Sequence, residues 1–308
     1  MSFGVPILLV AWRRPETLRQ VIYAIRKVQP TRLYVACDGP SPGRPGEAEK
    51  VLATKKVIED EINWSCHVEC LYSEINQGCR LGVSRAISWF FDQVEEGIIL
   101  EDDCVPHPDF FSYCDELLDR YRNDARIWWI SGTNARLGSI PSENSYFISR
   151  YGHCWGWATW RTRWTHYDRD LSSLSSFLKT HGFHSLFPDR RQAHFWRKQL
   201  LRLRDVHYPD TWDYQWSYTC LINGGLSVVP SSNLVSNIGF DQDATHTKNS
   251  YGALCTQVTQ SIMPLRHPEF LLPDPSVDLE TFNTICSVPF FRRLILKLQR
   301  ILDSFALP

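Results

Sequence analysis

The sequence predicts an α/β fold with a mostly parallel sheet that helices cover on both faces. Short apolar runs, typical of buried strands, alternate with amphipathic helical segments through the first 134 residues. The connecting stretches are rich in turn residues, as in GPSPGRPG at 39–46. The expected strands are residues 5–11, 33–38, 66–73, 97–103 and 127–134, and the expected helices are residues 15–28, 47–62, 78–94 and 108–121.

The alternation stops after residue 134, where several helical segments and one clear strand, 226–231, follow. We expect residues 1–134 and 135–263 to form two halves of one domain. Residues 264–289 have the composition of an extended connector, and residues 290–305 are expected to form a basic amphipathic helix. That helix either docks on the domain or lies on a membrane surface or a partner protein.

Composition excludes some classes of protein. A formal net charge of -1 argues against a nucleic-acid binder, which normally carries a basic excess. Ten cysteines without paired CxxC motifs are typical of reduced, buried thiols. The first apolar run is short and has no charged segment before it, so we expect neither a signal peptide nor a transmembrane helix, and a cytoplasmic protein that is free or peripheral to the membrane.

Polar residues follow three of the expected strands at their carboxyl ends: residues 12–14, Asp38, and the trio Glu101, Asp102 and Asp103, called here the acidic cluster. In a parallel sheet these ends meet at one edge, where ligands bind. Adjacent carboxylates repel by roughly 1 kcal/mol even in water, and a divalent cation relieves that repulsion. Mn²⁺ or Mg²⁺ favours one or two carboxylates together with substrate phosphates. A solvated turn before a helix is the alternative interpretation.

The acidic cluster, the following PDFFSY at 108–113 and the blocks WDYQW at 212–216 and NLVSNIGFDQDATHT at 233–247 resemble the GT-A glycosyltransferases. The nearest likenesses are to the N-acetylglucosaminyltransferase I type and to bacterial family 2-like enzymes. The resemblance spans roughly residues 5–250 in motif order. It implies a Rossmann-like GT-A fold whose residues 1–134 bind a nucleotide-sugar donor and whose residues 135–263 bind the acceptor.

The resemblance also implies roles within the acidic cluster. Asp103 would hold the metal ion that bridges the two donor phosphates. Asp102 would contact the ribose or the water shell of the metal, and Glu101 would contact the transferred sugar.

Further residues match donor-binding positions of the family. Asp38 would receive the nucleotide base. Arg13 or Arg14 would lie beside the nucleotide or its phosphates, with the choice between them open. Asn76 and Arg80 belong to a segment that passes beside the nucleotide, and a helix N-terminus there would also favour phosphate.

An inverting transfer needs a carboxylate that accepts the proton of the acceptor hydroxyl. Asp213, ringed by aromatic residues, matches the position of the presumed base of the family, and Asp210 is a weaker candidate. Asp213 is equally suited to cap a helix.

Two tryptophans and one histidine complete the expected site. Trp155 and Trp157 are acceptor candidates because sugar faces stack on indole, although Trp157 also fits a core-facing helix that we expect to run to Trp164. His246 lies in a polar segment expected to close over the donor. The resemblance implies that this histidine completes the metal shell or meets the pyrophosphate.

These features together predict a metal-dependent, inverting glycosyltransferase. Its donor would be a nucleotide-diphosphate sugar, with UDP-GlcNAc the first choice, and its acceptor a hydroxyl of a glycan or glycoconjugate. A nucleotidyltransferase that makes nucleotide sugars is an alternative, but it needs a Gly-rich loop where this chain has AWRRPETL. A carbohydrate-binding module without catalysis is a second alternative, but it gives the acidic cluster no function. A metal-dependent hydrolase is a third, but it would need more metal ligands from His and Asp side chains.

Overall fold

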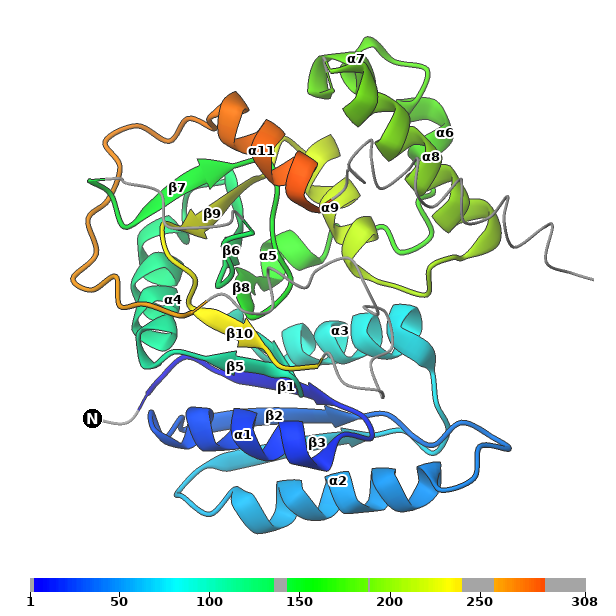
Figure 1. Ribbon diagram of the computed structural model, residues 1–308, viewed down its shortest axis with the longest axis vertical. Helices are drawn as coiled ribbons and strands as arrows, with labels where there is room; N and C mark the ends of the chain where they lie inside the picture. Colours follow the sequence, from blue (N-terminus) through cyan, green and yellow to red (C-terminus); the bar gives the residue numbers. More distant parts are fainter. Residues whose placement is uncertain (1–2, 136–142, 188, 240–257, 286–308) are drawn as a thin grey trace, which may run out of the picture.

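The computed structural model describes residues 3–135, 143–187, 189–239 and 258–285. Eight strands form one sheet in the order β3-β2-β1-β4-β8-β6-β9-β7 (Figure 1). Their bounds are β1 Ile7–Ala11, β2 Arg32–Cys37, β3 His67–Tyr72, β4 Glu96–Glu101, β6 Ile127–Ser131, β7 Tyr146–Ser149, β8 Trp157–Trp160 and β9 Leu226–Pro230. Strands β7 and β8 run antiparallel to their neighbours, and the other pairings are parallel. The predicted mixed α/β class is confirmed.

Helices lie on both faces of the sheet. They are α1 Pro15–Arg26, α2 Glu47–Glu61, α3 Ser84–Gln93 with the preceding π-helical turn η1 Cys79–Val83, α4 Pro108–Tyr121, α5 Arg161–Trp164, α6 Leu174–Phe177, α7 His181–Leu186, α8 Arg190–Val206, α9 Asp213–Ile222 and α11 Pro275–Ile285. Alternate side chains of β1 separate the two main cores. Ile7 and Leu9 pack with α1 and α4, and Leu8 packs with α3 and with a group of tryptophans on the other face.

A third core lies away from the sheet, where α6, α7 and α8 stack on α9 and α11 (Figure 1). A short two-stranded ribbon of β5 Cys104–Pro106 and β10 Val235–Asn237 follows the acidic cluster directly. This ribbon places Gly239 against the cluster. None of the helices in the described ranges is both long and apolar enough to cross a bilayer.

Two expectations from the sequence were wrong. Trp157–Trp160 is the strand β8 and not part of a helix, because it pairs on both sides with β4 and β6 and all four of its residues are buried. The connector 264–289 is not extended throughout, since α11 occupies Pro275–Ile285 and buries Val277 and Phe282. The expected helix 290–305 and His246 lie outside the described residues.

Candidate functional site

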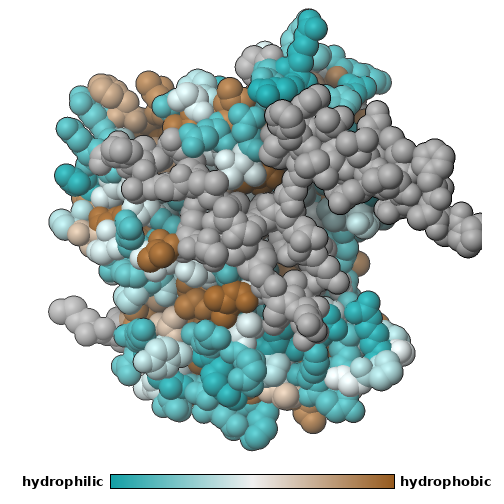
Figure 2. All heavy atoms as spheres, viewed as in Figure 1, coloured by the Kyte–Doolittle hydropathy of each residue, from teal (hydrophilic) through white to brown (hydrophobic). Residues whose placement is uncertain are grey.

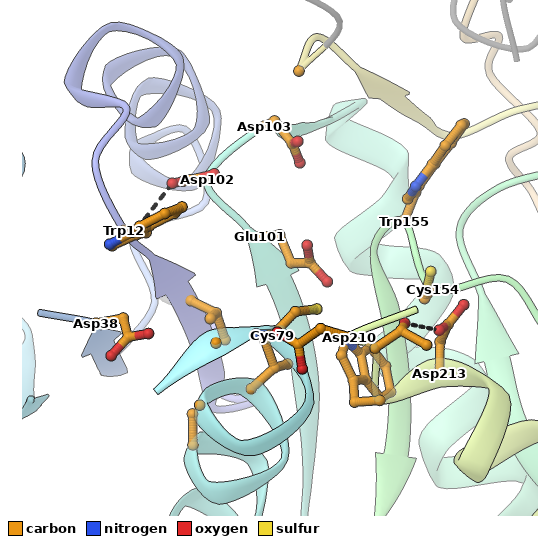
Figure 3. Close-up of a pocket in the computed structure, with 18 of the residues that line it drawn as sticks. Trp12, Asp38, Cys79, Glu101, Asp102, Asp103, Cys154, Trp155, Asp210 and Asp213 are labelled. Atoms are coloured by element: carbon orange, nitrogen blue, oxygen red, sulfur yellow. Dashed lines mark hydrogen bonds between the residues drawn. The ribbon is translucent and has the colours of Figure 1, made fainter. Parts of the chain in front are cut away.

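A cavity of about 890 Å³ opens at the carboxyl ends of β1, β2 and β4. The strand ends bring 12–14, Asp38 and the acidic cluster to one rim, as the sequence predicted (Figure 3). The opposite wall comes from residues 151–155 and from the segment that joins α8 to α9, which ends at Asp213. The cavity therefore lies between the two halves of the chain.

Two members of the acidic cluster are buried and paired with one arginine, whereas Glu101 is partly exposed. Asp102 and Asp103 are 2% and 7% exposed. The guanidinium of Arg14 donates to Asp102 through Nη2 and lies 2.8 Å from Asp103 through Nη1. Asp102 also accepts the backbone N–H of Trp12 at 3.0 Å. Arg14, and not Arg13, is thus the arginine at the acidic cluster.

Burial and mutual repulsion disfavour full ionisation of this cluster. Burial, reinforced by Asp103 and Asp102, raises the pKa of Glu101 to about 8. Burial also raises the pKa of Asp102 to about 6, although Arg14 opposes that change. Burial lowers the pKa of Arg14, but Asp102 and Asp103 outweigh it and leave the pKa above its usual value. Binding of a divalent cation beside the acidic cluster would therefore be strongly favoured, because it would stabilise the ionised carboxylates.

The carboxylates of the acidic cluster could supply only part of the coordination of a divalent ion. No three acidic, histidine or cysteine side chains within the described ranges form a metal cluster by themselves. The donor set is carboxylate oxygen, which suits Mg²⁺ and Mn²⁺ but supplies few ligands. The backbone of Gly239 packs so closely that a Cβ there would overlap the Asp103 carboxylate. Asp103 is accordingly fixed in place beside the cavity.

At the far end of the rim, the Asp38 carboxylate is hydrogen-bonded to groups in the two adjacent loops. Its carboxylate accepts the backbone N–H of Gly39 at 2.9 Å and that of Gln77 at 2.9 Å, and it accepts from the side-chain nitrogen of Asn76 at 2.9 Å. Burial raises the pKa of Asp38, and the backbone N–H groups oppose this. Asp38 and Asn76 both line the cavity, so they define its end while holding segments 38–39 and 76–77 together.

Arg13 is likewise engaged within the protein. Its guanidinium lies 3.0 Å from the buried carboxylate of Glu47 and stacks 4.2 Å from the centre of the Trp12 ring. Trp12 and Arg13 form one wall of the same end of the cavity. A planar base would meet an aromatic and cationic surface there.

Two donor-side expectations do not fit the structure. Arg80 turns away from the cavity and pairs with Asp170 at 2.5 Å. The helix N-terminus at Cys79, expected to favour phosphate, already receives the carboxylate of Asp210. Because these hydrogen bonds engage the Asp210 carboxylate, the weaker candidate for the base already has a structural role.

Asp213 is the first residue of α9 and faces the cavity across from Glu101 (Figure 3). The hydroxyl of Thr211 donates to its carboxylate. Two of the aromatic residues that ring it, Trp212 and Trp216, are buried at 2% and 0% exposure, and Trp212 still lines the cavity.

The tryptophans separate into one surface residue and one core residue. Trp155 lines the cavity, as an acceptor contact requires. Trp157 is 0% exposed, with its ring 5.2 Å from that of Trp129 and 5.4 Å from that of Trp212. We therefore withdraw Trp157 as an acceptor residue. His153 lines the cavity beside them, and burial lowers its pKa to about 4.

Sequence reasoning missed several residues of the cavity wall: Arg44, Cys79, Arg85, Tyr151, Cys154 and Trp196. The spacing of Cys79, Val83 and Ala86 on one face of a helix was a usable signal. No local pattern marked Tyr151 or Trp196, which reach the cavity from separate elements.

No protein-family model matches the chain, and no curated protein matches it. Among solved structures, the inositol-1-phosphate CTP transferase from T. maritima is 11% identical with a TM-score of 0.39, covering 82% of this chain and 96% of that chain. Mouse xyloside xylosyltransferase 1 is 9% identical with a TM-score of 0.36, covering 71% and 81%. The 4-diphosphocytidyl-2C-methyl-D-erythritol synthase from Anaerococcus prevotii is 10% identical with a TM-score of 0.36, covering 56% and 78%. Similarity this low carries no argument about the reaction of this chain.

Proposed function

We propose that the protein is a metal-dependent, inverting glycosyltransferase that moves a sugar from a nucleotide-diphosphate donor to a hydroxyl of a glycan or glycoconjugate. The observation that supports this is the facing arrangement of two kinds of acidic group in one cavity. The acidic cluster, neutralised in part by Arg14, stands on one wall, and Asp213 stands on the other. The acidic cluster with Arg14 is suited to bind a cation and a diphosphate, and Asp213 is suited to accept a proton.

The donor would lie along the rim. Its base would stack near Trp12 and Arg13 beside Asp38, and its diphosphate would reach Arg14 and Asp103. Arginine binds phosphate oxygens through paired N–H groups. A bound Mn²⁺ or Mg²⁺ ion held by Asp103 would offset the negative charge that develops on the departing diphosphate.

The acceptor would enter from the other wall, with one sugar face against Trp155. Asp213 would then accept the proton of the attacking hydroxyl. Glu101, which lies between the two walls, would contact the transferred sugar. The choice of a uridine donor, with UDP-GlcNAc first, rests on the family resemblance.

Two substitutions test this assignment. Asp103→Asn should abolish Mn²⁺-dependent turnover of the donor, because the neutral amide no longer attracts the cation. Asp213→Asn should bind donor with unchanged affinity yet lose transfer by about 10²–10⁴-fold, the usual worth of a general base. Asp119→Asn, whose side chain is exposed on α4, is the matched control.

The assignment fails if Asp103→Asn turns over donor at the wild-type rate. Glycan binding that is insensitive to EDTA and to Asp103→Asn would instead indicate a carbohydrate-binding module. Release of pyrophosphate from a nucleoside triphosphate and a sugar phosphate would indicate a nucleotidyltransferase.

A further inference from the structure

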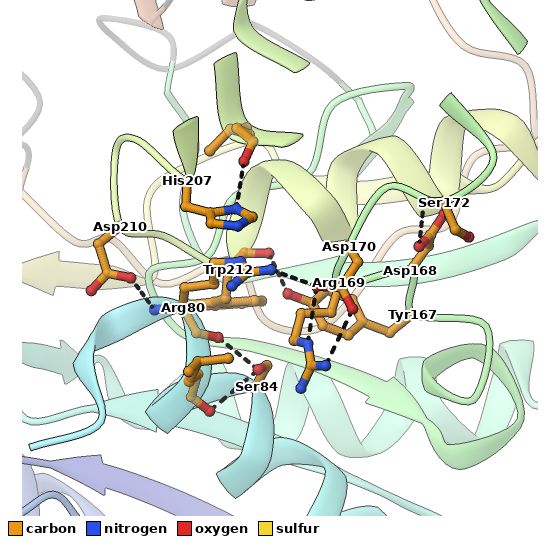
Figure 4. Close-up of polar contacts among 12 residues, drawn as sticks. Arg80, Ser84, Tyr167, Asp168, Arg169, Asp170, Ser172, His207, Asp210 and Trp212 are labelled. Carbon is orange, nitrogen blue, oxygen red and sulfur yellow. Dashed lines mark hydrogen bonds and ion pairs between the residues drawn. The ribbon is translucent and has the colours of Figure 1, made fainter. Parts of the chain in front are cut away.

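The segment that joins α8 to α9, residues 207–212, carries a second carboxylate that points away from Asp213. Asp210 lies at the cavity edge three residues before Asp213, and its side chain turns to the start of the helical run 79–93 (Figure 4). Asp210, in this segment, and Asp213, at the start of α9, are therefore three residues apart but contact different parts of the molecule.

Asp210 binds the first two amides of that helical run. Its Oδ2 accepts the backbone N–H of Cys79 at 2.8 Å, and its Oδ1 accepts that of Arg80 at 3.1 Å. Such N–H groups have no partner within their own helix, and a carboxylate there is favoured by the helix dipole. A Cβ at Gly78 would lie 2.5 Å from Asp210 Oδ2, so the carboxylate fits against bare backbone.

Neighbouring contacts join each of these two parts of the chain to the loop that follows α5 (Figure 4). The side chain of Arg80 pairs with Asp170 at 2.5 Å, on the loop that follows α5. The hydroxyl of Tyr167, on the same loop, donates to the backbone carbonyl of Trp212 at 3.1 Å. Residues 79–80, 167–170 and 210–212 thus form one connected patch that includes part of the cavity wall.

We propose that Asp210 is a positioning residue, which fixes Asp213 opposite the acidic cluster by tying segment 207–212 to the amides of Cys79 and Arg80. The proposal rests on the proposed function for its kinetic consequence, because it takes Asp213 to be the proton acceptor. The hydrogen bonds themselves join the donor half to the acceptor half directly. Loss of this tie would leave Asp213 chemically intact but displaced.

The kinetic test compares Asp210→Ala and Asp210→Asn with wild type. A misplacement of about 1 Å costs on the order of 10²-fold in rate, so we expect Asp210→Ala to lower kcat by that order while the donor KM changes little. Asn keeps one acceptor oxygen, so its loss should be smaller. The acidic limb of the pH–rate profile should stay where it is in wild type, because Asp213 still takes the proton.

A second measurement does not depend on activity. Hydrogen exchange of the peptide spanning residues 78–83 should show the Cys79 and Arg80 amides exchanging at least about tenfold faster in Asp210→Ala than in wild type. Asp205→Asn removes an exposed carboxylate that pairs with Arg204 on the same helix; it is the matched control and should change neither rate nor exchange. Thermal unfolding of each variant checks that it folds.

Each outcome decides something different. Unchanged amide exchange in folded Asp210→Ala refutes the tie, and faster exchange with unchanged kcat refutes its positioning role. Equal and complete loss of activity in both variants, together with loss of the acidic limb, would make Asp210 itself the base. If wild type transfers no sugar, the proposed function fails, and the exchange measurement still decides whether the tie exists.

Discussion

Arg14→Met is the substitution whose cost follows most directly from the geometry of the site. The Arg14 side chain is 16% exposed and contacts both Asp102 and Asp103. Methionine keeps much of the apolar stem but leaves those carboxylates without a cation. Breaking a buried ion pair in this way costs about 3–5 kcal/mol of unfolding free energy. With an unfolding entropy of about 2.1 cal/mol/K per residue, that is a fall of roughly 5–8 °C in the melting temperature of a chain of this length.

The loss should depend on pH, and its sign can be worked out. Glu101 and Asp102 have folded-state pKa values of about 8 and about 6, both above the ordinary values of 4.5 and 3.8. A raised folded-state pKa stabilises the fold below the ordinary pKa, and that stabilisation is lost as pH rises through the folded value. Without Arg14 both values should rise further. Arg14→Met should therefore be milder at pH 5.5, where these groups are largely protonated, than at pH 8.5.

The assay is thermal or urea unfolding of wild type and variant at both pH values, in the presence of EDTA. The control is Arg19→Met, which removes a half-exposed arginine of α1 paired with Glu16 on the same helix and with Glu61 at the end of α2; it should cost less than about 1 kcal/mol. A loss from Arg14→Met that is below about 1 kcal/mol, or the same at both pH values, would refute the view that this arginine holds a repelling acidic cluster together.

Two further substitutions probe the walls of the cavity. Gly239→Ala should displace the Asp103 carboxylate and lower the free energy of unfolding in urea by about 1–3 kcal/mol. The control is Gly4→Ala, whose added methyl group meets no atom within 4 Å and should leave stability nearly unchanged. Equal effects of the two substitutions would contradict the packing described. Trp157→Ala should lower the free energy of unfolding by about 3–5 kcal/mol because the ring is fully buried. Trp155→Ala should lower it by less than about 2 kcal/mol and should weaken acceptor binding. The reverse order of stabilities would show that the two residues are assigned the wrong way round.

The first half of the fold could be predicted because its signals are local. Each buried strand of residues 5–103 is a continuous apolar run, and the parallel topology then brings the strand ends to one edge. The strand β8 could not be predicted in the same way. Its tryptophans continue to Trp164 at a spacing that also suits a helix, and only pairing with β4 and β6, about 60 and 30 residues away in sequence, makes them a strand.

In the site as well, residues marked by local motifs could be predicted and long-range contacts could not. The acidic cluster and Asp213 were found from short motifs, since the chemistry they suit requires those residue types at element ends. The partners of Arg80 and Asp210 were not found, because they join residues 90 and 130 or 131 positions apart. Such contacts leave no pattern in a single sequence.

Binding of a nucleotide sugar together with a divalent ion at the acidic cluster is tested most directly by a thermal-shift screen of nucleotide sugars, with Mn²⁺ and with EDTA. A ligand at 100 times its Kd stabilises the fold by about 2.7 kcal/mol. We expect at least one donor, UDP-linked, to raise the melting temperature of wild type by several degrees with Mn²⁺, and to have little effect with EDTA or on Asp103→Asn. No shift with any donor, or an equal shift for wild type and Asp103→Asn, would contradict a metal-bridged donor at this site.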